Sequence, residues 1–255
     1  MANVNNPLRQ YFRRPAVYIT LPSKGKFYPQ GALETTETGE LPVYPMTAID
    51  EITSKTPDAL FNGSAIAELI KSCVPAIKDP WSIPSTDLDT VLVAIRAATN
   101  GNNLDIESVC ESCGETSKYG VNLMGMLGSI DISGYDKLLT IGELSFKFKP
   151  LTFKVVNQGN LDQFELQRQI NILEGIEDQD ERSKQSNALL KKLNTMNTSI
   201  VANTIESIST PTETVTDKAF IFEYLNGCDK NTFEEIRLHV VALRDASNIK
   251  PLQIT

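Results

Sequence analysis

The sequence predicts an α+β fold, in which short N-terminal strands and helices with a cysteine-knuckle hairpin precede a mainly helical C-terminal region. Apolar and polar residues alternate over Val17–Leu21, which is typical of a strand. Apolar residues recur at helical spacing over 86–99 and over 187–208. A Cys-x-x-Cys pair lies between two strand-like segments. We therefore expect three parts: a flexible arm at 1–16, an α+β domain with the cysteine hairpin at 17–130, and a hairpin with a helical domain at 131–255.

The first half alternates extended and helical segments. Lys26–Tyr28 lies between two turn signatures and is expected to be extended. Two prolines keep Leu41–Pro45 extended, because proline cannot donate a ladder hydrogen bond. Thr47 and Asp50 have the spacing of a helix cap, so a helix should begin there and end near Pro57. Further helices are expected over 64–73 and 86–99, and a hairpin over 104–123.

The second half is mostly helical after a hairpin at 138–149, where Leu144, Phe146 and Phe148 alternate with polar residues. Two long amphipathic helices should follow, and they could form a bundle or pack against a partner helix. The expected helices cover 153–174, 187–208, 217–226 and 231–245, with a polar bridge over 177–185 between the first two.

Length and charge limit the classes of function. The 255 residues suffice for one large domain or two modest ones. No apolar run approaches the ~18 residues of a membrane span, and the basic N-terminus lacks the features of a secretory signal. The net charge of −8 disfavours nonspecific nucleic-acid binding as the main task. We expect neither a membrane nor a nucleic acid as partner, and a reducing cytoplasmic compartment.

The Cys110–Cys113 pair is the sharpest local motif. Two thiolates at this spacing on a turn can bind one Zn²⁺, and Gly114 suits a tight knuckle. A structural zinc site needs four ligands, and Cys73 is a further candidate. His239 is the sole imidazole of the chain, and no second cysteine pair follows. Zinc coordination, a reduced pair without metal and a redox pair therefore all stay open, although a redox pair would normally open a helix.

No catalytic group stands out in the sequence. A single histidine, His239, removes most Ser/His/Asp and Cys/His schemes. Asp87 is well explained as a helix-capping residue, which leaves little reason to assign it to catalysis. We therefore expect no catalytic residue and no enzyme.

Exposed aromatic residues would suit a protein that holds partners by its surface. Tyr18, Phe27, Tyr28 and Tyr44 lie in proline-marked extended segments that offer backbone edges for docking. Trp81, between two prolines, could anchor a partner or fill the core, and both interpretations stay open. We take these five aromatic residues as candidate partner-binding residues.

Several phrases, in order, carry a resemblance to a known family over about the first half of the chain. With these phrases the sequence resembles the T4-like bacteriophage baseplate hub and hub assembly proteins. The phrases are Tyr18–Pro29, Gly39–Glu51, Pro57–Gly63, Ile70–Pro75 and Asp87–Ala98, followed by the Cys-x-x-Cys pair.

The resemblance implies a non-enzymatic component or assembly factor of the baseplate hub of a contractile tail. It implies protein–protein contacts with other baseplate and hub proteins, in the host cytoplasm during assembly and in the tail baseplate of the virion. A zinc-ribbon adaptor or regulatory binding module is the alternative function. The oligomeric state stays open.

Overall fold

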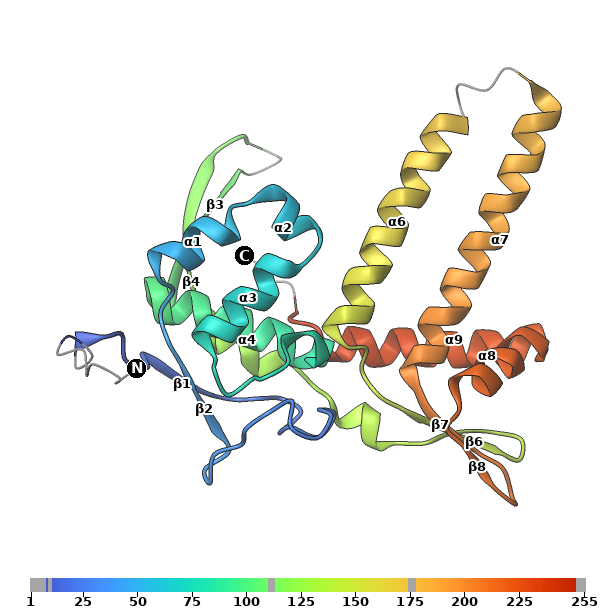
Figure 1. Ribbon diagram of the computed structural model, residues 1–255, viewed down its shortest axis with the longest axis horizontal. Helices are drawn as coiled ribbons and strands as arrows, with labels where there is room; N and C mark the ends of the chain where they lie inside the picture. The colour runs from blue at the N-terminus through green and yellow to red at the C-terminus, as the bar shows by residue number, and fades with distance from the viewer. Residues whose placement is uncertain (1–7, 9–10, 110–112, 174–177, 251–255) are drawn as a thin grey trace, which may run out of the picture. The chain divides into compact units, whose positions relative to one another are not determined.

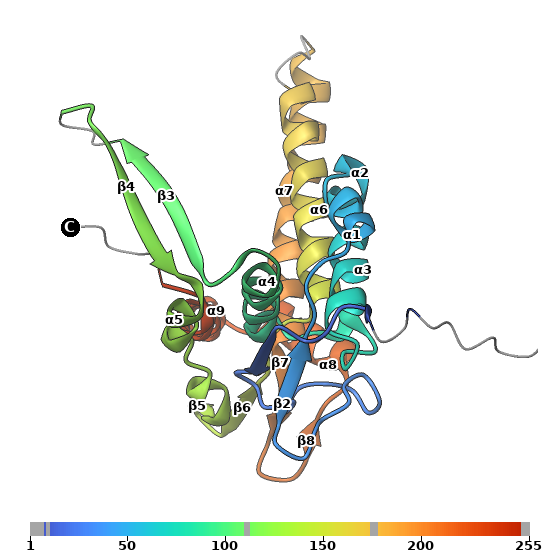
Figure 2. The same cartoon turned by 90° about the vertical axis from the view of Figure 1, so that its left-hand side faces the viewer.

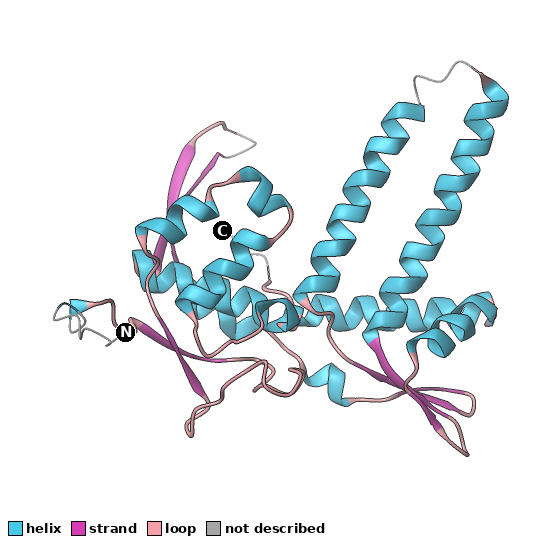
Figure 3. Cartoon of the chain, in the orientation of Figure 1, coloured by secondary structure: helices cyan, strands magenta, loops and turns pink. Residues whose placement is uncertain are grey.

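The computed structural model describes residues 8, 11–109, 113–173 and 178–250, and it confirms the α+β class (Figure 3). Strands and short helices come first, and long helices dominate the second half. The chain divides into two compact units. Unit 1 comprises Met1–Pro80 and Asp87–Gly128, and unit 2 comprises Trp81–Thr86 and Ser129–Thr255.

Unit 1 begins with a two-stranded antiparallel sheet that buries Ile19, Leu41 and Val43. Its helices pack on one another, and they bury Ile70 of one helix and Ile95 of another. The elements are β1 (Val17–Thr20), β2 (Glu40–Val43), α1 (Ala48–Ser54), α2 (Pro57–Phe61), α3 (Ser64–Cys73), α4 (Ser85–Asn100, of which the first two residues group with unit 2), β3 (Asn103–Val109), β4 (Thr116–Asn122) and α5 (Leu123–Met126).

The start of α1 confirms the predicted capping pattern. The Asp50 backbone N–H donates to Thr47 Oγ1 at 3.1 Å, and the Thr47 backbone N–H donates to Asp50 Oδ2 at 2.7 Å. These two bonds satisfy amides that have no partner within the helix. Pro57 then begins α2, where proline is favoured because its missing N–H would be unpaired anyway.

Strands β3 and β4 pair only with each other among the described residues, from Asn103 opposite Asn122 to Val109 opposite Thr116. Figure 2 shows them as a long two-stranded ribbon. The predicted hairpin is therefore present. Cys110 lies outside the described residues, whereas Cys113 is exposed in a turn before β4 begins at Thr116.

Unit 2 is built on a four-stranded antiparallel sheet in the order β5-β6-β7-β8. Its core contains Phe146, Phe148 and Ile205 from the sheet, with Ile221 and Ile236 from two helices. The elements are β5 (Leu139–Ile141), β6 (Leu144–Phe148), α6 (Phe153–Leu173), α7 (Gln179–Thr204), β7 (Ile205–Ser209), β8 (Thr214–Val215), α8 (Lys218–Gly227) and α9 (Lys230–Ser247), together with the short 3-10 helix η4 (Ser133–Asp136).

The two longest helices, α6 and α7, lie side by side and run antiparallel (Figure 1). Asp178 caps the start of α7 by accepting from the backbone N–H groups of Asp180 and Glu181. None of the described helices is long and apolar enough to cross a membrane.

Two local predictions were wrong. Residues 22–27 form successive turns instead of an extended Lys26–Tyr28 segment, because backbone bonds such as Lys24 N–H to Leu21 O close the loop. The helix predicted over 187–208 begins earlier, at Gln179, and ends at Thr204, because the β-branched Ile205 and Ile208 pair with β6 instead.

Candidate interaction surfaces

The predicted aromatic residues occupy different environments in unit 1. Tyr18 projects from β1 and is 59% exposed. Phe27 is half-buried, and the ammonium group of Lys26 lies 5.9 Å from its ring centre. Tyr28 and Tyr44 are also half-buried, and each faces a charged group of its own unit. Tyr18 is therefore the member of this set that is most open to a partner.

Arg13 holds the chain that precedes β1 against α3. Its guanidinium donates to Pro45 O at 2.6 Å and to Ser72 O at 2.7 Å, and it lies 3.3 Å from Asp50 Oδ2. The same group lies over the Tyr44 ring, 5.8 Å from its centre. Burial would raise the pKa of Asp50, but hydrogen bonds from Thr47 and Ser72 and the charge of Arg13 lower it. This end of the arm is therefore fastened to unit 1.

Asp87 is fully buried, and its carboxylate fixes the turn after β1. The Ser23 backbone N–H donates to Asp87 Oδ1 at 2.8 Å, and the Ser23 hydroxyl bonds to Asp87 Oδ2. Burial raises the pKa of Asp87, while the bonds from Ser23 oppose that rise. Burial and the Asp87 charge raise the pKa of Tyr28. The Asp87 carboxylate therefore has a structural role, because it holds the loop that contains Ser23.

Trp81 belongs to unit 2, where it stacks on Phe153 at the start of α6. The ring centres lie 5.0 Å apart with an angle of 9° between the planes. Offset or parallel stacking of this kind stabilises a packed core beyond the area it buries. Trp81 is half-buried.

The described cysteines form no disulfide and differ in their surroundings. Cys73 is fully buried near Arg13, and burial raises the pKa of its thiol. Cys228 is half-buried, and its Sγ lies 3.5 Å from Leu225 O. In the part of the chain that the structure describes, no group of three His, Cys, Asp or Glu residues could hold a metal. The zinc prediction for Cys110 and Cys113 falls partly outside the described residues and stays a prediction.

Helices α1 and α2 expose large apolar side chains. Ile49 and Ile52 of α1 are 75% and 69% exposed, and Leu60 and Phe61 of α2 are also exposed. No residue of either helix is buried. The two helices therefore present an apolar surface that packing within unit 1 does not explain.

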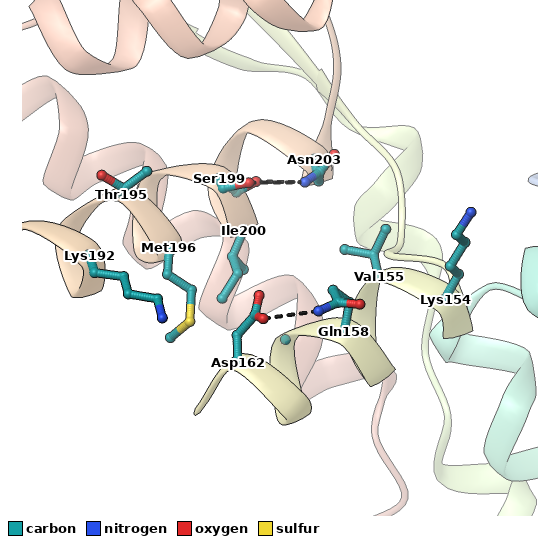
Figure 4. A pocket seen from close by; sticks show the side chains of 11 residues that line it. Lys154, Val155, Gln158, Asp162, Lys192, Thr195, Met196, Ser199, Ile200 and Asn203 are labelled. Atoms are coloured by element: carbon teal, nitrogen blue, oxygen red, sulfur yellow. Dashed lines mark hydrogen bonds between the residues drawn. The ribbon is translucent and has the colours of Figure 1, made fainter. Parts of the chain in front are cut away.

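A groove lies between α6 and α7, and we call it the α6–α7 groove. Its inner part is a cavity of about 550 Å³ next to the sheet end of the two helices (Figure 4). Met196 and Ile200 of α7 line this space together with Val155 and Gly159 of α6. Polar groups share this lining: the Gln158 amide donates to Asp162 at 2.9 Å (Figure 4), and Lys154 and Lys192 also line the space.

The outer part of the groove is a second cavity of about 450 Å³, and Lys192 lines both parts. Ile172 and Leu189 supply its apolar wall, and the Glu165–Arg168 ion pair lies at its edge. Only Phe153 and Leu166 are buried along α6, and α7 buries no residue before Thr198 among those described. The two helices therefore cover each other incompletely.

Comparison with protein families decides the identity of the chain. Residues 19–246 match the family described as T4 bacteriophage base plate protein. The chain belongs to this family. The match spans both units, so it includes the second half, where the sequence phrases carried no resemblance. No curated protein and no solved structure gives a match.

In this baseplate protein, sequence reasoning missed the surfaces that the structure makes most prominent. The apolar stripes of the long helices were visible, but nothing in the sequence showed that the stripes are left partly uncovered. Gly159 was the available signal, because glycine is unfavourable inside a helix and often marks a close approach or an open face. The outward position of Ile49 and Ile52 had no sequence signal that we recognise.

Proposed function

We propose that this baseplate protein is a non-enzymatic component or assembly factor of the baseplate hub, and that it acts through contacts with other hub proteins. The observation that carries the proposal is the pair of uncovered apolar surfaces, one in each unit: α1–α2 and the α6–α7 groove. Monomeric proteins rarely expose large apolar surfaces unless a partner covers them. The family match and the resemblance of the first half to hub proteins support the hub assignment.

The test is a phage that lacks the gene for this chain, supplied or not supplied with the gene in the host. We expect tails to stop before the baseplate is complete without the gene, and to recover with it. Electron microscopy of the tails and mass spectrometry of purified particles provide the readouts. Normal tails and full infectivity without the gene would overturn the proposal.

A second measurement tests the hub assignment itself. Co-expression with the hub proteins of the same phage, followed by size-exclusion chromatography with light scattering, should give a complex that contains this chain. If the chain elutes alone with every hub protein, the hub assignment fails, even when the deletion phage is defective.

The alternative function is a zinc-binding adaptor, favoured by the position of the Cys-x-x-Cys pair between the ends of β3 and β4. The last described pair of the ladder is Val109 opposite Thr116, so in the sequence the cysteine pair lies between the two strands, and a zinc knuckle needs its two cysteines close together in sequence. The zinc content of the purified protein distinguishes a zinc-binding adaptor from a hub component that binds no metal.

A further inference from the structure

The α6–α7 groove has the length and lining of a helix-binding site. Its lining residues run from Lys154 to Ile172 on α6, which spans about 27 Å at 1.5 Å per residue. The lining of the inner part combines the apolar side chains of Val155, Met196 and Ile200 with polar and charged ones. An amphipathic helix that lays its apolar face into a groove needs this arrangement. A third helix would also complete the packing that α6 and α7 leave unfinished.

The charges of the inner groove favour an acidic occupant. Lys154 and Lys192 line it, and neither forms an ion pair with another residue that the structure describes. Asp162 is the opposing charge of the inner part, where it accepts the Gln158 amide, and Glu165 of the outer part is stabilised as a carboxylate by the charge of Lys192. Three cationic side chains (Lys154, Arg168 and Lys192) and two anionic ones (Asp162 and Glu165) line the two parts together. Lys154 also lies in the first turn of α6, where the helix dipole disfavours a cation and favours an anion. A carboxylate beside Lys154 would be stabilised by the charge of the lysine and by the dipole of α6.

We propose that the α6–α7 groove binds one amphipathic helix of another protein. Leucine-like side chains of that helix fill the space beside Met196 and Ile200, and its carboxylates face Lys154 and Lys192. This rests on the proposed function, in which the other protein is a tail protein of the same phage. A second copy of this chain that docked through its own groove would fit less well, because it would bring the lining lysines of the two copies together.

Gly159 offers a way to block the groove without damage to the fold. A Cβ at this position would meet no atom within 4 Å, so Gly159→Leu fills the cavity and removes a helix-destabilising glycine. Asn160→Leu is the matched control, because Asn160 is exposed on the same helix and lies outside the groove lining. Both variants should retain the melting temperature of the parent chain or exceed it.

The deletion phage described above gives the first readout. We expect Asn160→Leu to restore infectious particles like the parent gene, and Gly159→Leu to restore at least tenfold fewer. If both variants restore particles equally, the groove proposal is wrong while the baseplate role stands. If the deletion phage needs no gene at all, the proposed function itself fails.

Charge provides the second readout, with two synthetic 18-residue amphipathic helices as probes. Both have leucines at i, i+3, i+4 and i+7, and their flanking residues are glutamate in one and lysine in the other. Fluorescence anisotropy should show the acidic peptide binding the full chain about tenfold more tightly than the basic one. Lys154→Glu with Lys192→Glu should invert this order. The matched control, Lys184→Glu with Lys191→Glu, makes the same charge change outside the groove and should preserve it.

Two results would overturn the choice of occupant. The first is an absence of binding by either peptide, or an equal affinity for both. The second is a dimer of the free chain, seen by analytical ultracentrifugation, that Gly159→Leu abolishes and Asn160→Leu preserves. That result would assign the groove to a second copy of this chain.

Discussion

At the scale of single residues, Asp87 shows how a buried carboxylate can specify a loop. It accepts two hydrogen bonds from Ser23, and it lies in a helix that begins more than sixty residues later in the sequence. Asp87→Ala would leave the Ser23 N–H buried without a partner. We expect a loss of about 3 kcal/mol in the free energy of unfolding. Urea denaturation followed by circular dichroism measures it.

Ser23→Ala is the control for that substitution, because it removes the hydroxyl bond and keeps the bond from the backbone N–H. A loss of about 1 kcal/mol is expected. Equal losses for the two variants would show that the backbone bond to Asp87 contributes little.

His239 should make unit 2 sensitive to mild acid. Its ring packs 4.9 Å from that of Phe148, its Nε2 is buried with no hydrogen-bond partner among the described residues, and burial lowers its pKa from 6.5. Below pH 6.5 the unfolded chain takes up a proton that the folded chain resists, so stability should fall as the pH falls from 7 to 5. His239→Leu should flatten this slope. Urea midpoints at several pH values measure it, and an unchanged slope in the variant would assign the effect to other groups.

The same scale shows what local sequence can predict. The Thr47–Asp50 cap depends on residues three apart, so the pattern alone was sufficient. The Ser23–Asp87 contact joins distant positions, and the sequence offered only a helix-capping role for Asp87. Tyr28 was predicted to be a partner-binding residue because of its aromatic ring, yet its hydroxyl is buried, and burial and the charge of Asp87 raise its pKa. Whether a side chain is buried depends on residues that are distant in the sequence, and a local sequence pattern does not identify them.

At the scale of elements, the β3–β4 hairpin carries the metal prediction. If its cysteine pair forms half of a zinc knuckle, the chain purified under reducing, chelator-free conditions should contain zinc, and Cys113→Ser should remove most of it. Cys228→Ser is the control, because Cys228 lies in α8's C-terminal cap and away from the hairpin sequence. Inductively coupled plasma mass spectrometry gives the metal content. A zinc content near zero in the parent chain would show that the zinc prediction is wrong.

Helices were easier to predict than strands for a physical reason. Helix α4 was placed within one residue at each end, because helical hydrogen bonds and the apolar stripe are local. Strand β7 was assigned to the preceding helix, because Ile205 and Ile208 suit both structures and only their pairing with β6 decides. The candidate groove was missed for a related reason: a sequence shows an apolar stripe but not whether another element covers it.

At the scale of the whole molecule, the chain enters unit 2 twice. Residues 81–86 supply Trp81, which stacks on Phe153, and two short backbone bonds: Ser85 N–H to Leu151 O and Phe153 N–H to Ile83 O, each at 2.7 Å. Trp81→Ala should therefore destabilise unit 2, by about 2 kcal/mol. Hydrogen exchange should become faster in α6 and β6 and stay unchanged in β1 and β2.

Tyr18→Ala is the control for that prediction, because the ring of Tyr18 is mostly exposed and its loss should change exchange rates little. Faster exchange confined to β1 and β2 in the Trp81→Ala protein would contradict the assignment of residues 81–86 to unit 2.

The junction of α7 and β7 has a mechanical consequence. The helix ends at Thr204 and the strand begins at Ile205, and Lys218 Nζ donates to Ala202 O at 3.2 Å and also to Ile205 O. A three-residue loop at this place would stretch about 10 Å before it passed on a pull. Here there is no slack, so a force on α7 reaches the hydrogen bonds between β6 and β7 at once. A partner that binds α6 and α7 is therefore coupled mechanically to the sheet of unit 2.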